Sequence, residues 1–273
     1  MDIRELEKLY EDGSKHSIYQ NLPDFVSEHI DYKVEINEEW RGDRTRLEYV
    51  KKFISEVEFK TLGDIGANTG YFSLSLANEY KDKKVLAYEI NRNHCDLMKV
   101  IKANFNMENI EVIEEGVDLS KIKDIDYRDI YLFFNVIHHA GVDFDKDLNI
   151  TTENFMAYTE SFLKLLKNKC KYLVFQMGYN HGGNKSTPIV SPEEVYEMLK
   201  YQIRLFENSG WNILDIAYAE NKNKKYISIK NKEYDVENEV YKKAIDKYLD
   251  QYSIYKNSEF YKRPIIILEN TER

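Results

Sequence analysis

The sequence predicts an α/β fold in which helices cover one open, mostly parallel sheet. From residue 59 onward, short apolar runs alternate with amphipathic stretches of a dozen or more residues. This alternation is typical of repeated strand–helix–strand units. The chain has 273 residues, of which 42% are hydrophobic, and this is enough for one large core or two small ones.

The first 58 residues are predicted to form a helical extension that caps the sheet. Apolar residues recur at helical spacing near the start, and residues 44–57 place five apolar side chains on one stripe. Asp43, just before this stripe, is a candidate N-cap. We therefore divide the chain into an extension at 1–58 and a core at 59–273.

Seven apolar runs of the core are predicted strands, with helices between most of them. The strands are 60–65, 84–89, 110–115, 129–134, 172–177, 211–219 and 263–269. The helices are 69–80, 93–106, 152–168 and 191–209. Residues 221–262 are predicted to be an insertion before the last strand, with a short strand at 226–229 and a helix at 236–252.

Composition excludes several functions. The chain has 39 Lys and Arg against 48 Asp and Glu, so its net charge of -9 repels phosphate backbones and anionic membranes. Nucleic acid and membrane partners are therefore not expected. Cys95 and Cys170 stand far apart without a His or Cys neighbour at ligand spacing, so we expect neither a disulfide framework nor a metal site. The charged first residues and the absence of a long apolar run predict a cytoplasmic protein.

A glycine loop follows the first predicted strand. Gly66 and Gly70 allow a ligand to approach the backbone at the carboxyl edge of the sheet. Asp64 indicates the charge of the ligand, because a pyrophosphate at the helix N-terminus is poorly matched to a carboxylate beside it. A cationic ligand suits this position, and S-adenosylmethionine carries both an ammonium and a sulfonium group.

Two further carboxylates follow the next strands. Glu89 ends the second predicted strand, where an acidic residue can accept hydrogen bonds from both ribose hydroxyls. Asp118 follows the third strand and is a candidate acceptor for an adenine amino group. Asp118 can equally be a turn or helix-cap aspartate.

Asp64, Gly66 and Gly70 match the Asp-x-Gly-x-x-x-Gly motif of class I S-adenosylmethionine-dependent methyltransferases, which the chain resembles over about 59–219 and 263–269. Many members have a further glycine where this chain has Asn68. The resemblance implies a Rossmann-like fold of seven strands with the last antiparallel, and S-adenosylhomocysteine as product. The further cofactor contacts that we infer with it are Asn68, Tyr71, Phe72 and Asn135.

The loop after the fourth strand carries His138 and His139. In the resembling family this loop lies beside the methyl donor, which implies that the histidine pair faces the acceptor. A neutral imidazole can take a proton from a hydroxyl, and His139 is our first choice for this base. Alternatively, the histidines satisfy backbone groups of their loop, and alignment of the reactants suffices without a strong base.

Two other groups of residues are candidate acceptor contacts. Tyr179 and His181 stand in a glycine-bearing loop after the fifth strand, and its glycines would allow the loop to move as a lid. Alternatively, this segment is simply a long solvated loop. A second group combines an aromatic plane with guanidinium groups that can bind a phosphate or carboxylate, or that simply form surface ion pairs at a helix start. Its members are Trp40, Arg41, Arg44 and Arg46. An anionic or nucleotide-activated acceptor is accordingly a hypothesis.

We predict an enzyme that methylates an oxygen of a small polar or phosphorylated acceptor. The sequence resembles methyltransferases of bacterial capsule and surface-polysaccharide pathways, which implies that the acceptor is a precursor of such a polysaccharide. The segment around Trp40 also resembles tRNA wobble-uridine modifying enzymes of the same superfamily, although the net charge opposes an RNA substrate. A third alternative is a non-catalytic partner subunit that binds S-adenosylmethionine. The sequence predicts no particular oligomeric state.

Overall fold

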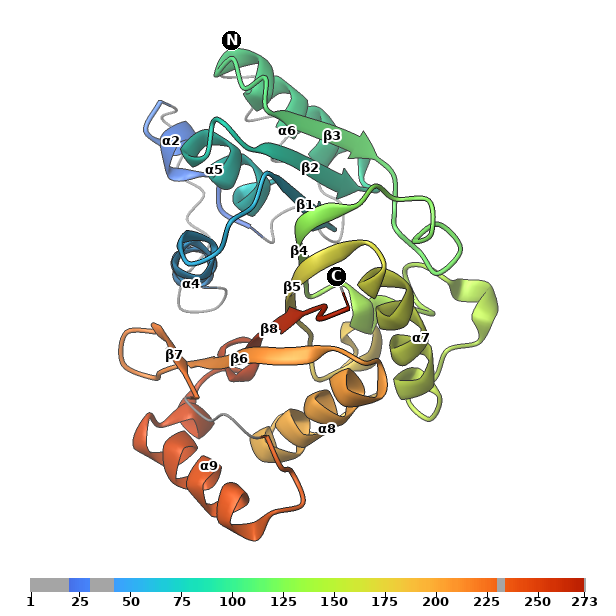
Figure 1. Ribbon diagram of the computed structural model, residues 1–273, viewed down its shortest axis with the longest axis vertical. Coiled ribbons are helices and arrows are strands. Elements are labelled where there is room, and N and C mark those ends of the chain that lie inside the picture. Colours follow the sequence, from blue (N-terminus) through green and yellow to red (C-terminus); the bar gives the residue numbers. More distant parts are fainter. Residues whose placement is uncertain (1–19, 30–41, 230–233, 273) are drawn as a thin grey trace. The chain divides into compact units, whose positions relative to one another are not determined.

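A computed structural model describes residues 20–29, 42–229 and 234–272. The chain divides into two compact units, which we call the first and the second unit. The first unit comprises residues 1–117 and 128–132, and the second comprises 118–127 and 133–273. Strand β4, at Arg128–Phe134, contributes residues to both units. Figure 1 labels the elements.

The first unit has a parallel sheet in the order β3-β2-β1-β4, with helices between its strands. Strands β1, β2 and β4 are mostly buried, as expected for central strands covered on both faces, whereas the edge strand β3 is partly exposed. The elements before β4 are α2 (Asp24–Ser27), α4 (Asp43–Ser55), β1 (Thr61–Ile65), α5 (Tyr71–Glu79), β2 (Lys84–Glu89), α6 (Arg92–Asn104) and β3 (Ile110–Glu114).

The second unit has strands in the order β5-β8-β6-β7. Strand β8 lies between β5 and β6 and runs antiparallel to both, which confirms the predicted antiparallel last strand. The strands are β5 (Cys170–Gln176), β6 (Asn212–Ala219), β7 (Tyr226–Ser228) and β8 (Ile265–Glu269). The helices are α7 (Phe155–Lys167), α8 (Val195–Asn208) and α9 (Glu239–Gln251), and the short 3-10 turns are η1 (Ile137–His139), η2 (Lys146–Leu148), η3 (His181–Gly183), η4 (Ile254–Lys256) and η5 (Glu259–Lys262).

The predicted α/β class is confirmed, but the described chain has eight strands rather than seven. The additional strand, β7, comes from the insertion and pairs antiparallel with β6, Ala219 opposite Tyr226. The edge of β6 was available for this pairing because β8 occupies only its other side. Helix α9 of the insertion packs against α8, as Figure 1 shows.

The start of α4 differs from the prediction. Gly42, with φ +55°, is the N-cap, and Asp43 is the first helical residue without a capping hydrogen bond. The side chain of Asp43 is instead fully buried and paired with Arg46. The predicted capping role of Asp43 was therefore wrong, because an ion pair inside the first unit takes its carboxylate.

A glycine within β1 fixes the spacing of the strands before the ligand loop. Gly63 pairs with Tyr131 of β4. A Cβ atom on Gly63 would lie only 2.0 Å from the Tyr131 ring. Glycine at this position therefore lets the aromatic ring pack across β1, next to the carboxyl end where Asp64 stands.

Candidate functional site

The loop after β1 turns at three residues with left-handed backbone conformations. The φ angles are +76° at Gly66, +54° at Asn68 and +86° at Gly70. Glycine and asparagine adopt this region most readily, so Asn68 meets a backbone requirement at the position where many family members have a glycine. A Cβ on Gly70 would lie 2.6 Å from the side chain of Met98 in α6, so the loop packs closely against that helix.

The first N–H groups of this loop donate to acceptors of the protein itself. Those of Gly66 and Ala67 both donate to the carbonyl of Tyr88 at 2.9 Å. The N–H of Asn68 donates to Oε2 of Glu89 at 2.7 Å. The loop is thus tied to the end of β2, and these three N–H groups do not form an open cradle for a phosphate.

The first turn of α5 is occupied in the same way. The N–H of Tyr71 donates to Oε1 of Gln20 at 3.0 Å. The carboxyl of Asp64 receives hydrogen bonds from both the backbone and the hydroxyl of Ser73. A dinucleotide needs N–H groups at a helix N-terminus that point toward its pyrophosphate. The loop geometry therefore disfavours a dinucleotide, in agreement with the prediction made from Asp64.

Asp64 is a buried carboxyl in an unusual protonation state. Its side chain is buried, with 3% relative exposure for the residue, and the Ser73 hydroxyl donates to Oδ2 at 2.6 Å. Burial raises the pKa of Asp64 to about 7, against the lowering effect of the Ser73 hydrogen bond. Near neutral pH the group therefore lies between its neutral and ionised forms, and a cationic ligand would favour the carboxylate.

Glu89 ends β2 with its two oxygens oriented by the backbone. Oε2 accepts from Asn68 and Oε1 accepts from the N–H of Asn91, each at 2.7 Å. Burial raises the pKa of Glu89, while these two hydrogen bonds oppose the rise. A carboxylate oxygen can accept more than one hydrogen bond, so both oxygens retain capacity for ligand hydroxyls.

An exposed apolar side chain follows Glu89 directly. Ile90 is 70% exposed, and a Cβ on Gly116 would lie 3.2 Å from its Cδ1. A branched apolar surface beside a carboxylate suits a nucleoside, whose ribose is polar and whose base is a flat ring. The sequence analysis did not select Ile90, although its position next to Glu89 was the available signal.

Of the four predicted guanidinium and aromatic contacts, the structure describes Arg44 and Arg46, which lie in different environments. Trp40 and Arg41 lie outside the described residues. Arg44 is largely exposed and lies 3.4 Å from Asp24, a surface ion pair of little energetic weight. Arg44 is exposed and Arg46 is buried, so these two residues do not form one exposed anion-binding cluster.

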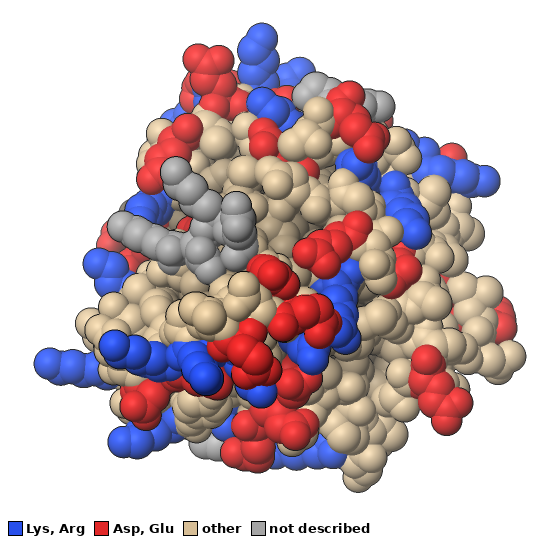
Figure 2. Space-filling view, turned by 60° about the horizontal axis from the view of Figure 1, so that its bottom comes forward, with Lys and Arg blue, Asp and Glu red and all other residues tan. Residues whose placement is uncertain are grey.

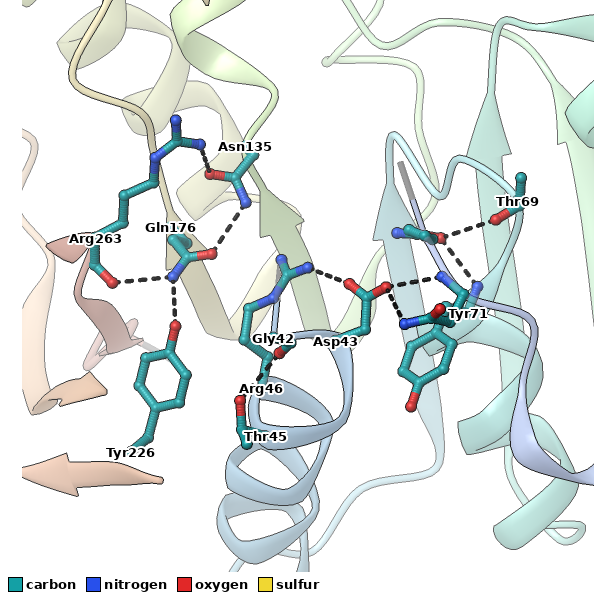
Figure 3. A network of polar contacts seen from close by, with 12 residues as sticks. Gly42, Asp43, Thr45, Arg46, Thr69, Tyr71, Asn135, Gln176, Tyr226 and Arg263 are labelled. Carbon is teal, nitrogen blue, oxygen red and sulfur yellow. Dashed lines mark hydrogen bonds and ion pairs between the residues drawn. The ribbon is translucent and has the colours of Figure 1, made fainter. Parts of the chain in front are cut away.

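Arg46 is buried in the first unit. Its Nη2 lies 2.5 Å from Oδ1 of Asp43, and its guanidinium lies 4.9 Å from the centroid of the Phe72 ring. Oδ2 of Asp43 accepts from the N–H of Asn21 at 2.9 Å. Figure 3 shows Asp43 and Arg46 pointing toward each other. The positive charge of Arg46 also lowers the pKa of Asp64 slightly, so Arg46 influences the carboxyl beside the glycine loop.

Asp118, in the second unit, closes a turn. Its Oδ1 accepts from the N–H and hydroxyl of Ser120 and from the N–H of Lys121. Partial burial raises the pKa of Asp118, but these hydrogen bonds outweigh it and hold the pKa below its usual value. This geometry matches the alternative of a turn aspartate, and a contact with adenine stays a prediction.

His139 stands in η1, directly beyond β4, beside an acidic partner. Its Nδ1 lies 2.8 Å from Oδ2 of Asp143, and its side chain is 23% exposed. A carboxylate accepts hydrogen bonds only, so it favours a proton on Nδ1 and leaves Nε2 as the acceptor. That tautomer is the one that a general base needs, and the catalytic role of His139 stays a prediction.

His138 is held differently. It is buried, and its Nδ1 accepts from the N–H of Gly178 at 3.1 Å. Burial, and then the neighbouring His139 and Arg263, lower the pKa of His138 well below its ordinary value. A Cβ on Gly178 would lie 2.7 Å from Nε2 of His138. His138 is therefore a neutral, tightly packed ring whose hydrogen bond joins the ends of β4 and β5.

Tyr179 and His181 are both engaged inside the second unit. The hydroxyl of Tyr179 is buried and donates to the carbonyl of Lys262 at 3.1 Å. Nε2 of His181 lies 2.8 Å from the carbonyl oxygen of Ala140, which requires the proton on that nitrogen. These contacts tie the loop after β5 to its neighbours, and contact with an acceptor stays a prediction for both residues.

Asn135 is the centre of a partly buried hydrogen-bond network in the second unit. It has a left-handed backbone, with φ +59°. Its Oδ1 accepts from Arg263 at 2.8 Å, and its Nδ2 donates to Oε1 of Gln176 at 3.0 Å. Gln176 in turn donates to the hydroxyl of Tyr226 at 3.1 Å. Figure 3 shows this chain of contacts, which commits both ends of the Asn135 side chain to positioning.

Comparison with known proteins gives a weak sequence relative. No family model matches the sequence. A tRNA U34 carboxymethyltransferase of Desulfotalea psychrophila is 25% identical over 110 residues, which cover 40% of this chain and 33% of that protein. This chain therefore matches only a third of that relative's length.

The solved structures give a clearer result for the fold. WbdD, described as a bifunctional kinase-methyltransferase, matches 97% of this chain and 47% of its own in two structures, with TM-scores of 0.56 and 0.55 and identities of 11% and 12%. The chain has the fold of the class I methyltransferases. The chain matches about half of WbdD, and at this identity the likeness concerns the fold alone.

In this methyltransferase fold, several residues that contact the predicted site residues were missed by the sequence analysis. Ser73 and Asp143 were detectable, since Ser73 lies in the first turn of the predicted helix and Asp143 stands four residues after His139. Gln20 and Asn21 carry no comparable signal, because their partners are distant in the sequence. They are the larger gap in the prediction.

Among the residues that the structure describes, no three His, Cys, Asp or Glu side chains gather as a metal site. Within the same residues, no helix combines the length and apolar character needed to cross a membrane.

Proposed function

We propose that the protein transfers a methyl group from S-adenosylmethionine to an oxygen of a small polar or phosphorylated acceptor. The observation that carries the proposal is the pair of buried carboxyls, Asp64 and Glu89, beside a glycine loop whose N–H groups are already bonded. This arrangement fits a cationic nucleoside with free ribose hydroxyls and disfavours a pyrophosphate.

Each carboxyl has a distinct part in holding the donor. Asp64, with its pKa near 7, supports the positive charge of the donor as its own proton leaves. Glu89 accepts from the ribose hydroxyls while Asn68 and Asn91 hold its oxygens in place. Ile90 offers an apolar surface to the base. When bound, S-adenosylmethionine supplies an electrophilic methyl group and becomes S-adenosylhomocysteine after transfer.

His139 is the group that we assign to the acceptor hydroxyl. Its Nε2 takes the proton of the hydroxyl as that oxygen attacks, and Asp143 stabilises the resulting charge on the imidazole at Nδ1. His138 does not share this step, because burial lowers its pKa and makes it a poor proton acceptor, and its Nδ1 already accepts from Gly178. The donor groups and the base stand in the first and second units respectively.

The acceptor class is supported by resemblance and by charge. Methyltransferases of capsular and surface polysaccharide pathways, which the sequence resembles, act on polar precursors, and one of the structural matches, WbdD, is described as a kinase-methyltransferase. Arg263 is a cation of the second unit, although it is paired with Glu259 at 2.8 Å. A phosphorylated or nucleotide-activated hydroxyl compound fits this combination.

A tRNA substrate is the second candidate, favoured by the carboxymethyltransferase relative. The charge distribution opposes it. Figure 2 shows Lys and Arg interspersed with Asp and Glu over the face that it draws. Within the lysine run of the insertion, Nζ of Lys224 is bonded to Asn257 at 2.7 Å and lies over the ring of Tyr261. A phosphate-binding stripe needs such side chains to extend into solvent.

The experiment that tests the proposal has two steps. Calorimetry with S-adenosylmethionine and S-adenosylhomocysteine measures donor binding to the wild type and to Asp64→Ala and Glu89→Ala. We expect a loss of about 1 to 3 kcal/mol in each variant. Unchanged affinity in both would contradict the donor site. Single-turnover assays read by mass spectrometry then compare activated sugars with tRNA, and binding without transfer to any acceptor would favour a non-catalytic partner subunit.

A further inference from the structure

We propose that Gln20 is a positioning residue of the donor site, which holds the glycine loop in its binding shape and couples donor binding to the placement of residues 20–29. The inference rests on the proposed function. Gln20 Oε1 accepts from the N–H of Tyr71 at 3.0 Å and lies 3.5 Å from the hydroxyl oxygen of Thr69.

Helix α5 cannot cap its own N-terminus. Its N-cap is Gly70, which has a left-handed backbone and no side chain to accept a hydrogen bond. The first N–H groups of a helix need an acceptor from outside the helix. Gln20 provides that acceptor for Tyr71 across 51 positions of the sequence. The cap is therefore tertiary, and it lasts only while the segment that carries Gln20 stays in place.

The segment that carries Gln20 is anchored at several points of the first unit. The N–H of Asn21 donates to Asp43 at 2.9 Å. Val26 is fully buried, and the ring of Phe25 meets that of Phe105 edge-on at 5.0 Å. These anchors hold Gln20 against the loop, and a displacement of the loop would in turn release Gln20.

The same turn of α5 is held from a second direction. Asp43, which binds the backbone of Asn21, also binds Arg46, whose guanidinium lies over the ring of Phe72. The first two residues of α5 are therefore linked to one segment, directly through Gln20 and indirectly through Asp43. These contacts favour the loop conformation that binds the donor. If they are lost, a smaller fraction of molecules is competent to bind, and the apparent affinity for the donor decreases by the same factor.

A matched pair of variants tests the role of Gln20. Gln20→Met keeps the length of the side chain but removes the acceptor, whereas Gln20→Glu keeps an acceptor. We expect S-adenosylhomocysteine to bind the full-length Met variant about tenfold more weakly, as the loss of one hydrogen bond implies. The Glu variant should stay within about twofold of wild type. Ser27→Ala, in the same segment, removes a hydroxyl that donates to the carbonyl of Asp24 within α2, and this variant should bind as wild type.

Hydrogen exchange separates a positioning role from a general loss of stability. In the wild type, S-adenosylhomocysteine should slow exchange in both 66–73 and 20–29. In Gln20→Met it should slow exchange in 66–73 alone, with the thermal unfolding curve showing a folded protein.

Three results would overturn the inference while the proposed function stands: wild-type affinity in Gln20→Met, equal losses in the Met and Glu variants, or no ligand effect on residues 20–29 of the wild type. Failure of the wild type itself to bind S-adenosylhomocysteine would instead overturn the proposed function, and this inference with it.

Discussion

The hydroxyl of Ser73 lies 2.6 Å from Oδ2 of Asp64, so the first turn of α5 holds the carboxyl that ends β1. The same turn receives Gln20 at Tyr71. One short stretch of helix thus links the sheet, the glycine loop and the N-terminal segment. Burial raises the pKa of Asp64 to about 7, against the lowering effect of the Ser73 hydrogen bond, so stability and ligand binding should depend on pH.

We expect Asp64→Asn to stabilise the ligand-free protein at alkaline pH. The pKa rises from 3.8 to about 7 on folding, so the folded state holds the proton more tightly than the unfolded state. The protonated Asp64 therefore contributes up to about 4 kcal/mol to the free energy of unfolding below pH 4, and this contribution is lost as pH rises to 7. The difference in unfolding free energy between variant and wild type should therefore increase between pH 5 and pH 8 in urea titrations.

Asp129→Asn is the control for this prediction. Hydrogen bonds from Lys60 and Thr61 hold the pKa of Asp129 below its usual value, despite partial burial. Its contribution should be lost as pH falls, which is the opposite sign. A pH dependence of the same sign in both variants would contradict the assignment to Asp64.

Donor binding should release protons at neutral pH. A cationic ligand stabilises the ionised form of Asp64, so affinity for S-adenosylmethionine should rise by up to tenfold per pH unit below about pH 7 and level off above it. Calorimetry in two buffers of different ionisation enthalpy counts the protons. The release should disappear in Asp64→Asn, and an unchanged count there would assign it to another group.

His139 and Asp143 should affect turnover rather than donor binding. His139→Ala should lower kcat by about 10²–10⁴-fold, the usual contribution of a general base. Asp143→Asn should lower kcat less than His139→Ala, because the imidazole is retained and the imidazolium loses only its anionic partner. Equal losses in kcat and donor affinity would remove His139 from the chemistry.

Gly63→Ala should destabilise the first unit, because the new Cβ would lie 2.0 Å from the Tyr131 ring. Overpacking of this kind costs about 1–3 kcal/mol or more. Gly116→Ala, where the nearest atom is the flexible end of Ile90 at 3.2 Å, should cost less. Urea unfolding compares the two, and the double variant Gly63→Ala with Tyr131→Leu should recover part of the loss.

The sequence alone determined the sheet, its predicted strands and the glycine loop. These features depend on local patterns, because apolar runs, glycine spacing and strand-end carboxylates recur at short distance in the chain. Asp64, Gly66, Gly70 and Glu89 could be selected for that reason. The strand β7 was visible as a short apolar run, but its pairing with β6 was not.

Only the tertiary structure decided how these residues are held. Arg46 is buried against Asp43 and Phe72, Gln20 caps a helix 51 positions away, and Asn135 is bound by Arg263. His138 and His139 are neighbours of the same type, yet one is packed on Gly178 and the other faces Asp143. Burial and long-range hydrogen bonds set the charge and tautomer of a side chain, and neither quantity is encoded in the spacing of residues along the chain.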